Sequence, residues 1–388
     1  MEKIIIFGGD GFCGWPLSLK LSHDYEIHIV DDLSRREIDK ELGVDSIVPI
    51  HSISERIKKW YEITNKKIFF HKMNIVNDIK KLENLFIKVN PYAVVMLAEL
   101  KSAPYSLKSL KHGNKTIHNN LISNHNLLNI ISSKCPSCHF VHLGTMGVYG
   151  YDYSNKLLPD GYYDAVLTNH VGDKIEKKLL HPASPGSIYH LTKAQEEIMF
   201  QYFQKIYQLK ITDLHQGIVW GVNTNDTVMD EVLFNRFDYD GDYGTVLNRF
   251  IVQTAIGYPL TVHGSGNQIR PLININNSVE AIKLVIDNPP INEEKVRIYN
   301  QLAETFRISD IANKLKKNYS VNIDNQVNPR IEDENNNLKA KPIGLLELGL
   351  KPIYFDHNKI QEMVNLAKRF SNRINKDKIK SITSWKLK

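Results

Sequence analysis

Cysteine is scarce in this chain: its 388 residues include three cysteines, too few for a disulfide framework. Two of them fall in Cys135-Pro136-Ser137-Cys138-His139, which matches both a redox Cys-x-x-Cys and a haem-attachment pattern. Haem attachment requires export, and zinc requires four convergent ligands, for which no second pair exists. We therefore interpret both as structural loop cysteines, with a local disulfide as the alternative, and we expect no metal site.

Long apolar runs are also missing. No run approaches the roughly 20 residues that cross a bilayer, and no signal or transit segment precedes the strand expected from Lys3. We therefore expect a cytoplasmic enzyme with no membrane partner. The net charge of +6 comes largely from the C-terminal turns, which a solvated helix and tail explain, so nucleic acid is not an expected partner.

What the sequence does contain is an alternation of short apolar runs and longer amphipathic stretches, the signature of β-α-β units. The expected strands are Lys3–Phe7, Glu26–Val30, Ile68–Lys72, Ala93–Leu97, Phe140–Leu143 and Thr212–Val219, and the expected helices include Gly14–Leu21, Val76–Val89, Asn119–Ser132 and Ile188–Tyr207. This pattern predicts an α/β fold with a doubly wound, Rossmann-type parallel sheet.

The alternation fades after Gly221, where a helix at Val246–Ile256 and a strand at Pro259–His263 follow. We expect residues 1–221, with roughly 271–300 returning, to form the Rossmann domain. Residues 222–270 and 301–388 would form a smaller C-terminal substrate-binding domain.

A glycine-rich turn, Gly8-Gly9-Asp10-Gly11-Phe12-Cys13-Gly14, joins the first strand to the first helix. Glycines spaced three apart allow a tight turn and a close approach to a pyrophosphate, and the helix N-terminus offers free N–H groups to it. A short glycine motif is weak evidence alone, but the strand before it and the helix after it support a dinucleotide-binding turn. The expected cofactor site follows the strand ends: Gly8, Asp10, Gly11, Phe12, Cys13, Gly14, Asp31, Asp32, Leu33, Arg35, Arg36, Asn74, Ile75, Leu97, Glu99, Asn119, Tyr189, Lys193, Gln216 and Val219.

Asp31 ends the second strand, where a carboxylate can accept both ribose hydroxyls and repel a 2′-phosphate. It therefore favours NAD over NADP. Arg35 and Arg36 lie nearby and could instead welcome that phosphate, which leaves the alternative open. A turn-capping acid is the purely structural interpretation of Asp31.

Tyr189 and Lys193 are four residues apart, which places them on one face of a helix. An ammonium close to a phenol lowers its pKa, so Tyr189 is predicted to shuttle a proton from a sugar hydroxyl while a hydride leaves the same carbon. Thr145 follows a strand and would share that proton's path. Alone, each of these features is common on structural helices and strands.

Together, the glycine turn, Thr145, Tyr189 and Lys193 resemble the extended short-chain dehydrogenase/reductase family, whose members act on nucleotide sugars. Its 4,6-dehydratases carry an Asp-Glu pair directly after the threonine. Met146 and Gly147 occupy those positions here and cannot transfer a proton, so a simple dehydratase is not expected. A 4-epimerase needs no such acid.

Longer stretches look like the UDP-sulfoquinovose synthases of that family. They are Gly8–Trp15, Asp31–Ile50, Lys101–Ser106, Tyr189–Lys193, Asp213–Gly221, Asn235–Gly264 and Asn328–Pro352. The resemblance implies UDP-glucose and sulfite as substrates, tightly held NAD and a homodimer, with a sulfur-donor protein as a further partner. It implies C4 oxidation, loss of water across C5–C6, sulfite addition at C6 and C4 reduction. Whether the product enters a sulfolipid or a glycan stays open.

The same resemblance assigns further roles. Met146 would line the C6 pocket, and His190, titrating near neutrality, would supply the acid or base of the elimination; packing beneath the substrate is the alternative. Lys101 stands where the family has an arginine, and would attract sulfite. The expected substrate site is Lys101, Thr145, Tyr189, Gln216, Val219, Val246, Leu247, Asn248, Arg249, Thr261, Val262, His263, Arg270, Arg330 and Glu332.

Two other function classes remain beside the synthase. A UDP-glucose 4-epimerase would use the same oxidation and return the hydride to the other face. A non-enzymatic nucleotide-sugar sensor is the third interpretation, and the intact set of Thr145, Tyr189 and Lys193 argues against it.

Overall fold

A seven-stranded sheet forms the centre of the computed structural model, which describes residues 1–150, 157–291, 295–330, 332, 336–380, 383 and 385. The strand order is β13-β9-β5-β4-β1-β2-β3 and every pairing is parallel. The strands are β1 (Lys3–Phe7), β2 (Glu26–Asp31), β3 (Ile68–Lys72), β4 (Ala93–Met96), β5 (His139–Thr145), β9 (Lys210–Gln216) and β13 (Arg297–Gln301). The predicted Rossmann-type sheet is therefore confirmed.

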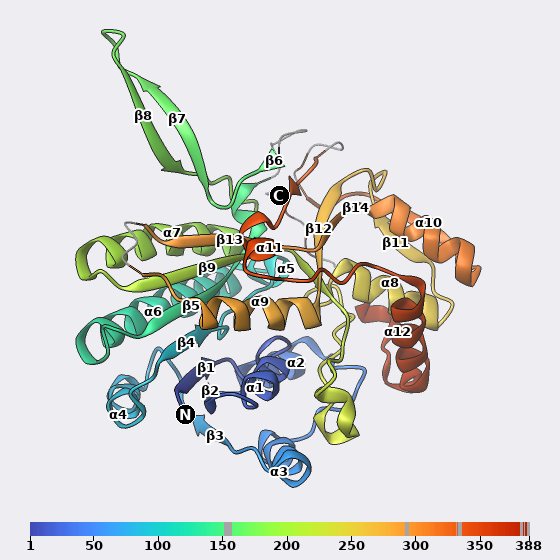
Figure 1. Cartoon of the computed structure of the whole chain (residues 1–388). Helices are drawn as coiled ribbons and strands as arrows, with labels where there is room; N and C mark the ends of the chain where they lie inside the picture. Colours follow the sequence, from blue (N-terminus) through green and yellow to red (C-terminus); the bar gives the residue numbers. More distant parts are fainter. Residues whose placement is uncertain are drawn as a thin grey trace.

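Helices cover both faces of this sheet (Figure 1). They are α1 (Gly14–Leu21), α2 (Ser34–Leu42), α3 (Ile53–Thr64), α4 (Ile79–Val89), α5 (Ala103–Ser106), α6 (Leu110–Lys134), α7 (Ile188–Tyr207) and α9 (Ile275–Asp287). Successive side chains of β1 alternate between two cores: Ile4 and Ile6 pack in one, and Ile5 and Phe7 in the other. Burial on both faces explains why these strands read as continuous apolar runs.

Most expected elements match to within a few residues, and the largest differences concern a strand and a helix. The stretch expected as one strand over Thr212–Val219 divides at Gly217 into β9 and β10 (Ile218–Trp220), and β10 leaves the main sheet to pair with β12. A Cβ at Gly217 would lie 2.9 Å from the Pro271 carbonyl oxygen, so the break needs glycine. The helix expected from Asn119 begins at Leu110.

A second region packs beside the carboxyl ends of the main strands. A three-stranded sheet holds β10, β12 (Ile269–Asn274) and β14 (Glu304–Arg307), and β11 (Leu260–His263) pairs with β15 (Ile323–Gln326). Its helices are α8 (Val246–Ala255), α10 (Ile308–Tyr319) and α12 (His357–Arg369). Although it lies in the stretch expected to belong to this region, α11 (Ile343–Glu347) packs against β13 of the main sheet, with Leu345 in a core of that sheet. Trp220, Phe250 and Leu315 are fully buried in its separate core.

A hairpin of β7 (Tyr162–Thr168) and β8 (Lys174–Leu180) extends away from the body (Figure 1). The sequence analysis did not predict it. Two further short strands, β6 (Leu157–Leu158) and β16 (Lys339–Ala340), pair with each other near its base. The three cysteines are buried free thiols, and Cys135 and Cys138 occupy the turn between α6 and β5. Among the described residues, no helix combines the length and hydrophobicity that spanning a bilayer requires.

Candidate active site

A cavity of about 410 Å³ lies where the carboxyl ends of β1, β4, β5 and β9 meet the second region. Parallel α/β sheets bind ligands at this edge. The cavity runs from the glycine turn, past Thr145 and Tyr189, to Arg249 and Arg330. It brings together all the predicted site residues except Leu33, Arg36, Leu247, Asn248 and Val262.

The glycine turn closes tightly at the start of α1. Gly8 has a φ of +82°, and a Cβ there would lie 2.8 Å from the backbone nitrogen of Ala98. A Cβ at Gly14 would lie 2.0 Å from the carbonyl oxygen of Gly8. Side chains at either position would force the turn apart, which leaves bare backbone and the first turn of α1 facing the cavity. This arrangement fits a pyrophosphate.

Asp31 is held by the turn itself. Its Oδ2 accepts the N–H of Asp10 at 3.0 Å and its Oδ1 accepts the N–H of Leu33 at 2.8 Å. Each oxygen keeps a lone pair for a ribose hydroxyl. Burial is the main cause that raises the pKa of Asp31 to about 6. Leu33 acts through its backbone, in a left-handed conformation with φ of 65°.

The two arginines that could have welcomed a 2′-phosphate are both paired with acids, although Arg35 still lines the cavity. Arg36 donates to both carboxylate oxygens of Asp10, at 2.7 and 2.9 Å, and lies outside the cavity lining. Arg35 pairs with Asp39 and lies 3.9 Å over the ring of Tyr243. The residues present therefore fit NAD, and NADP loses its expected cationic partners.

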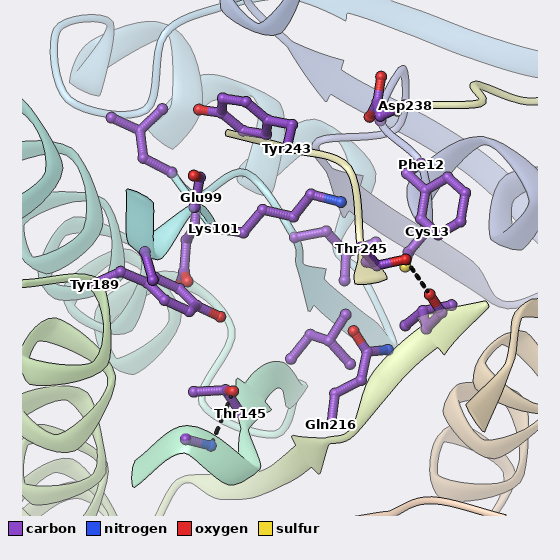
Figure 2. A pocket seen from close by; sticks show the side chains of 18 of the residues that line it. Phe12, Cys13, Glu99, Lys101, Thr145, Tyr189, Gln216, Asp238, Tyr243 and Thr245 are labelled. Atoms are coloured by element: carbon purple, nitrogen blue, oxygen red, sulfur yellow. Dashed lines mark hydrogen bonds between the residues drawn. The ribbon is translucent and has the colours of Figure 1, made fainter. Parts of the chain in front are cut away.

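Tyr189 and Thr145 lie on the same side of the cavity (Figure 2). The Thr145 hydroxyl also accepts the N–H of Gly147 at 3.1 Å, which fixes its position. Burial raises the pKa of Tyr189 above its ordinary value; the bond with Thr145 lowers it, while the nearby Glu196 and Asp213 raise it further. This direction is opposite to the lowering expected from Lys193.

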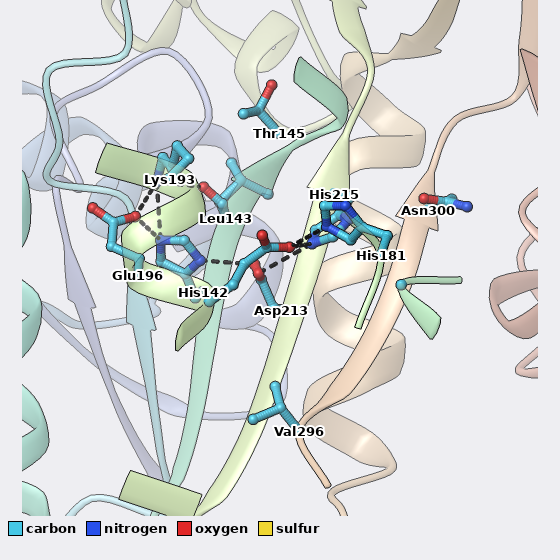
Figure 3. A network of polar contacts seen from close by, with 12 residues as sticks. His142, Leu143, Thr145, His181, Lys193, Glu196, Asp213, His215, Val296 and Asn300 are labelled. Carbon is cyan, nitrogen blue, oxygen red and sulfur yellow. Dashed lines mark hydrogen bonds and ion pairs between the residues drawn. The ribbon is translucent and has the colours of Figure 1, made fainter. Parts of the chain in front are cut away.

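Lys193 reaches beneath the cavity floor into a group of buried acids. Its ammonium contacts the carboxylate of Glu99, donates to the Leu143 carbonyl at 3.0 Å, and lies 3.3 Å from Glu196. Its Nζ is also 2.9 Å from the Nε2 of His142 (Figure 3). Glu99, expected to border the cofactor, therefore also pairs with Lys193. The sequence analysis missed Glu196 and His142.

His190 fills the space that a side chain at position 147 would need. A Cβ at Gly147 would lie 2.3 Å from Cδ2 and 2.4 Å from Nε2 of the imidazole. The His190 Nδ1 lies 3.1 Å from the Ser187 hydroxyl. Burial and the nearby Arg330 and Arg270 lower the pKa of His190 to about 3. The expectation that it titrates near neutrality is therefore wrong in this structure.

Lys101 extends into a subsite that also holds Phe12, Cys13 and Asp238 (Figure 2). Its ammonium lies 4.9 Å from the centroid of the Phe12 ring. Burial is the main cause that lowers the pKa of Lys101. This subsite also contains Arg236, Tyr243 and Thr245, which the sequence analysis did not single out.

The far end of the cavity is rich in arginine. Burial and Arg330 lower the pKa of Arg249 to about 10, so two cationic side chains face the same space. Arg270 is 2.5 Å from the Glu332 carboxylate. Two guanidinium groups close together form a site for an anion such as a diphosphate.

Some of the β11 backbone groups that were expected to bind uracil already form hydrogen bonds within the protein. The N–H of Thr261 donates to Gln253, and the carbonyl of His263 accepts from Gln268. Thr261 and His263 line the cavity, while Val262 belongs to the core of the second region. Leu247 also packs in that core, and Asn248 is buried, so these three residues lie outside the cavity lining and their ligand contacts stay predictions.

Residues 4–300 match the NAD dependent epimerase/dehydratase family. The chain is 38% identical to the chloroplastic UDP-sulfoquinovose synthase of Spinacia oleracea over 391 residues, covering 99% of this chain and 79% of that protein. It is 34% identical to the UDP-sulfoquinovose synthase of Sulfolobus acidocaldarius, covering 90% and 88% of the two chains. The chain belongs to the NAD dependent epimerase/dehydratase family, in its UDP-sulfoquinovose synthase group.

Solved structures of this epimerase/dehydratase family share the fold. The UDP-glucose 4-epimerase of Thermotoga maritima, solved with UDP-glucose, superposes with a TM-score of 0.67 at 20% identity, covering 96% of this chain and 99% of that one. The UDP-glucuronic acid 4-epimerase of Bacillus cereus, solved with UDP-glucuronic acid and NAD, gives 0.67 at 19% identity, covering 95% and 99%. NAD is the cofactor of this NAD-dependent family, and the cavity described above fits it.

Proposed function

We propose that this protein is a UDP-sulfoquinovose synthase, which converts UDP-glucose and sulfite to UDP-sulfoquinovose. Its similarity to the spinach and Sulfolobus synthases over most of the chain supports this proposal. The observation that carries it is the placement of His190 in the space beside Gly147, in one cavity with Tyr189 and Lys101.

The first step requires a proton and a hydride to leave the C4 carbon of glucose. When bound at the glycine turn, NAD⁺ would supply a reversible hydride acceptor. Thr145 and Tyr189 then hold the C4 hydroxyl, with Tyr189 receiving its proton. The raised pKa of Tyr189 keeps the phenol protonated in this structure, so its role as the base requires that pKa to fall when the cationic cofactor binds.

Oxidation at C4 acidifies the C5–H, and water can then leave across C5–C6. The sequence offers no carboxylate at 146 or 147 for this step. His190 stands in the volume of the missing side chain. With a pKa of about 3 it is neutral at physiological pH. Its imidazole would accept the C5 proton and return it to the C6 hydroxyl, which leaves as water. Met146 would present only a thioether, which leaves the alkene unprotonated.

Sulfite addition at C6 needs a cation, because both the nucleophile and the nucleotide are anionic. Lys101 is the proposed sulfite-binding residue, since its ammonium lies beside an aromatic ring in a confined subsite. Arg249 and Arg330 would hold the diphosphate at the other end. A homodimer, a sulfur-donor protein and a cytoplasmic location stay predictions from the sequence.

Mass spectrometry of the purified protein with UDP-glucose, with and without sulfite and with no added NAD, tests the proposal. We expect a product in which a sulfonate replaces a hydroxyl, formed only with sulfite. UDP-galactose without a sulfonated product would identify a 4-epimerase, the activity in the name of a structural relative. Ligand binding with no turnover would identify a sensor.

A further inference from the structure

Lys193 is surrounded by ionisable groups from four elements beneath the cavity (Figure 3). Glu99 follows β4, His142 lies on β5, Asp213 on β9 and Glu196 on α7. Tyr189, also on α7, lies above them at the cavity. The side chains of Glu99, His142, Lys193, Glu196 and Asp213 are all at most 4% exposed.

Burying an ammonium without compensation favours its neutral form. Two carboxylates lie close enough to oppose this: Glu99 in direct contact and Glu196 at 3.3 Å. Burial lowers the pKa of Lys193, and Glu196 and Asp213 act in the opposite direction. The acids therefore oppose the loss of charge that burial of Lys193 favours.

His142 completes this arrangement from the other side. Its Nδ1 is 2.7 Å from Asp213, and its Nε2 is 3.0 Å from Glu99 and 3.2 Å from Glu196. Burial alone would lower its pKa, but Asp213 and Glu196 outweigh burial and raise it to about 9. His142 and Lys193 share the carboxylates of Glu99 and Glu196. Because His142 Nε2 is also 2.9 Å from Lys193 Nζ, a charged imidazole repels the ammonium, and the two carboxylates must offset that repulsion as well.

We propose that Glu99 and Glu196 are positioning residues, which keep the ammonium of Lys193 charged and fixed in place beneath the cavity, with His142 and Asp213 fixing the two carboxylates. The inference rests on the catalytic role of Lys193 in the proposed function. It adds that the role of Lys193 depends on buried acids. Of these, Glu99 lines the cavity, whereas Glu196 and Asp213 do not.

Glu196 and Glu197 provide a matched pair of variants. Both are buried on α7, but Glu197 pairs with His181 at 2.9 Å and His215 at 2.8 Å instead of Lys193. Glu196→Gln removes a charge from the lysine site without changing shape. Glu197→Gln makes the same chemical change one residue away, and Glu196→Asp keeps the charge.

The experiment measures the pH profile of kcat/KM for sulfonation, together with the retained NAD and the Tm of each variant. An opposite charge within about 4–6 Å shifts a pKa by roughly 1–3 units. Losing Glu196 therefore lowers the pKa of Lys193. In the pH profile of Glu196→Gln, we expect the alkaline limb, where kcat/KM falls as Lys193 loses its proton, to move to lower pH by about one unit or more. Glu196→Asp is expected to restore the original limb, and Glu197→Gln to leave it in place.

An alkaline limb in Glu196→Gln that coincides with the unmodified enzyme would overturn the inference, and so would an equal shift in Glu197→Gln. A merely structural role for Glu196 would lower the Tm without moving the limb. Lys193→Met separates the two proposals: full sulfonation by that variant would refute the catalytic role of Lys193 itself.

Discussion

The fit between Gly147 and His190 predicts a specific failure in Gly147→Ala. The added methyl carbon would lie 2.3 Å from Cδ2 of the imidazole, whereas carbon atoms pack at about 3.5–4.0 Å. One group must therefore move by roughly 1 Å or more. His190 is buried, with its Nδ1 beside Ser187 and its ring 5.1 Å from the ring of Tyr189. Moving the imidazole therefore disturbs the reaction centre.

Gly147→Ala is expected to lower both the free energy of unfolding and the reaction rate. Overpacking a buried site costs about 1–3 kcal/mol of the free energy of unfolding. A displacement of about 1 Å at a reaction centre can cost roughly a hundredfold in rate. Because the methyl group acts on the imidazole, deleting the ring should remove the clash. Gly147→Ala should therefore cost less stability in a His190→Ala background, by about 0.5–3 kcal/mol of coupling.

A double-mutant cycle over these two positions measures the coupling, with urea unfolding for stability and sulfonation for rate. Gly113→Ala is the control, because a Cβ there meets its nearest atom, the carbonyl oxygen of Ser106, at 3.4 Å, within α6. It should be neutral, or stabilise by up to about 1 kcal/mol through helix propensity. Additive effects of Gly147→Ala and His190→Ala would refute the steric reasoning.

Three further outcomes follow from the site. Tyr189→Phe should lose roughly a hundredfold or more in turnover, the scale of general acid–base catalysis, and keep its bound NAD, which the absorbance of the denatured supernatant reports. Lys101→Ala should raise the KM for sulfite more than that for UDP-glucose, with Lys101→Arg keeping sulfite use; equal losses would count against the role of Lys101. The pKa of His190, about 3 when folded against about 6.5 unfolded, leaves stability intact above pH 6.5. Below it the unfolded state binds a proton that the folded state does not, so His190 removes about 1.4 kcal/mol per pH unit. His190→Gln should therefore unfold less steeply on acidification from pH 6.5 toward 4, and an unchanged slope would show that His190 is protonated in the fold.

The sheet was predictable because its strands are buried on both faces, which gives uninterrupted apolar runs such as Ile4-Ile5-Ile6-Phe7. The start of α6 was not, since its first turns carry Lys111, Gly113 and Asn114 without a clear apolar period. The break between β9 and β10 falls at Gly217, and the polar residues His215 and Gln216 before it still belong to β9. Only the close approach of Pro271, distant in sequence, requires it.

The candidate site, like the fold, was predictable only in part. Motif spacing in the sequence singled out the glycine turn, Asp31, Tyr189 and Lys193, and all of them line one cavity. The ion pairs around Lys193 escaped prediction because their members come from separate strands and a helix. A signal was nevertheless present: His142 and Asp213 interrupt central strands with ionisable side chains, which is costly unless the groups are paired.

The chain passes more than once between the two sheets, which limits how domains of this protein could be exchanged with those of a relative. After β9 the backbone enters the three-stranded sheet as β10, and after β12 it returns through α9 and β13 before leaving again at β14. A sugar-binding half therefore cannot be exchanged by cutting at one junction, because any such cut also removes a strand from the cofactor-binding sheet. New substrate preferences in this scaffold are expected to arise from point changes at the cavity wall and not from domain shuffling.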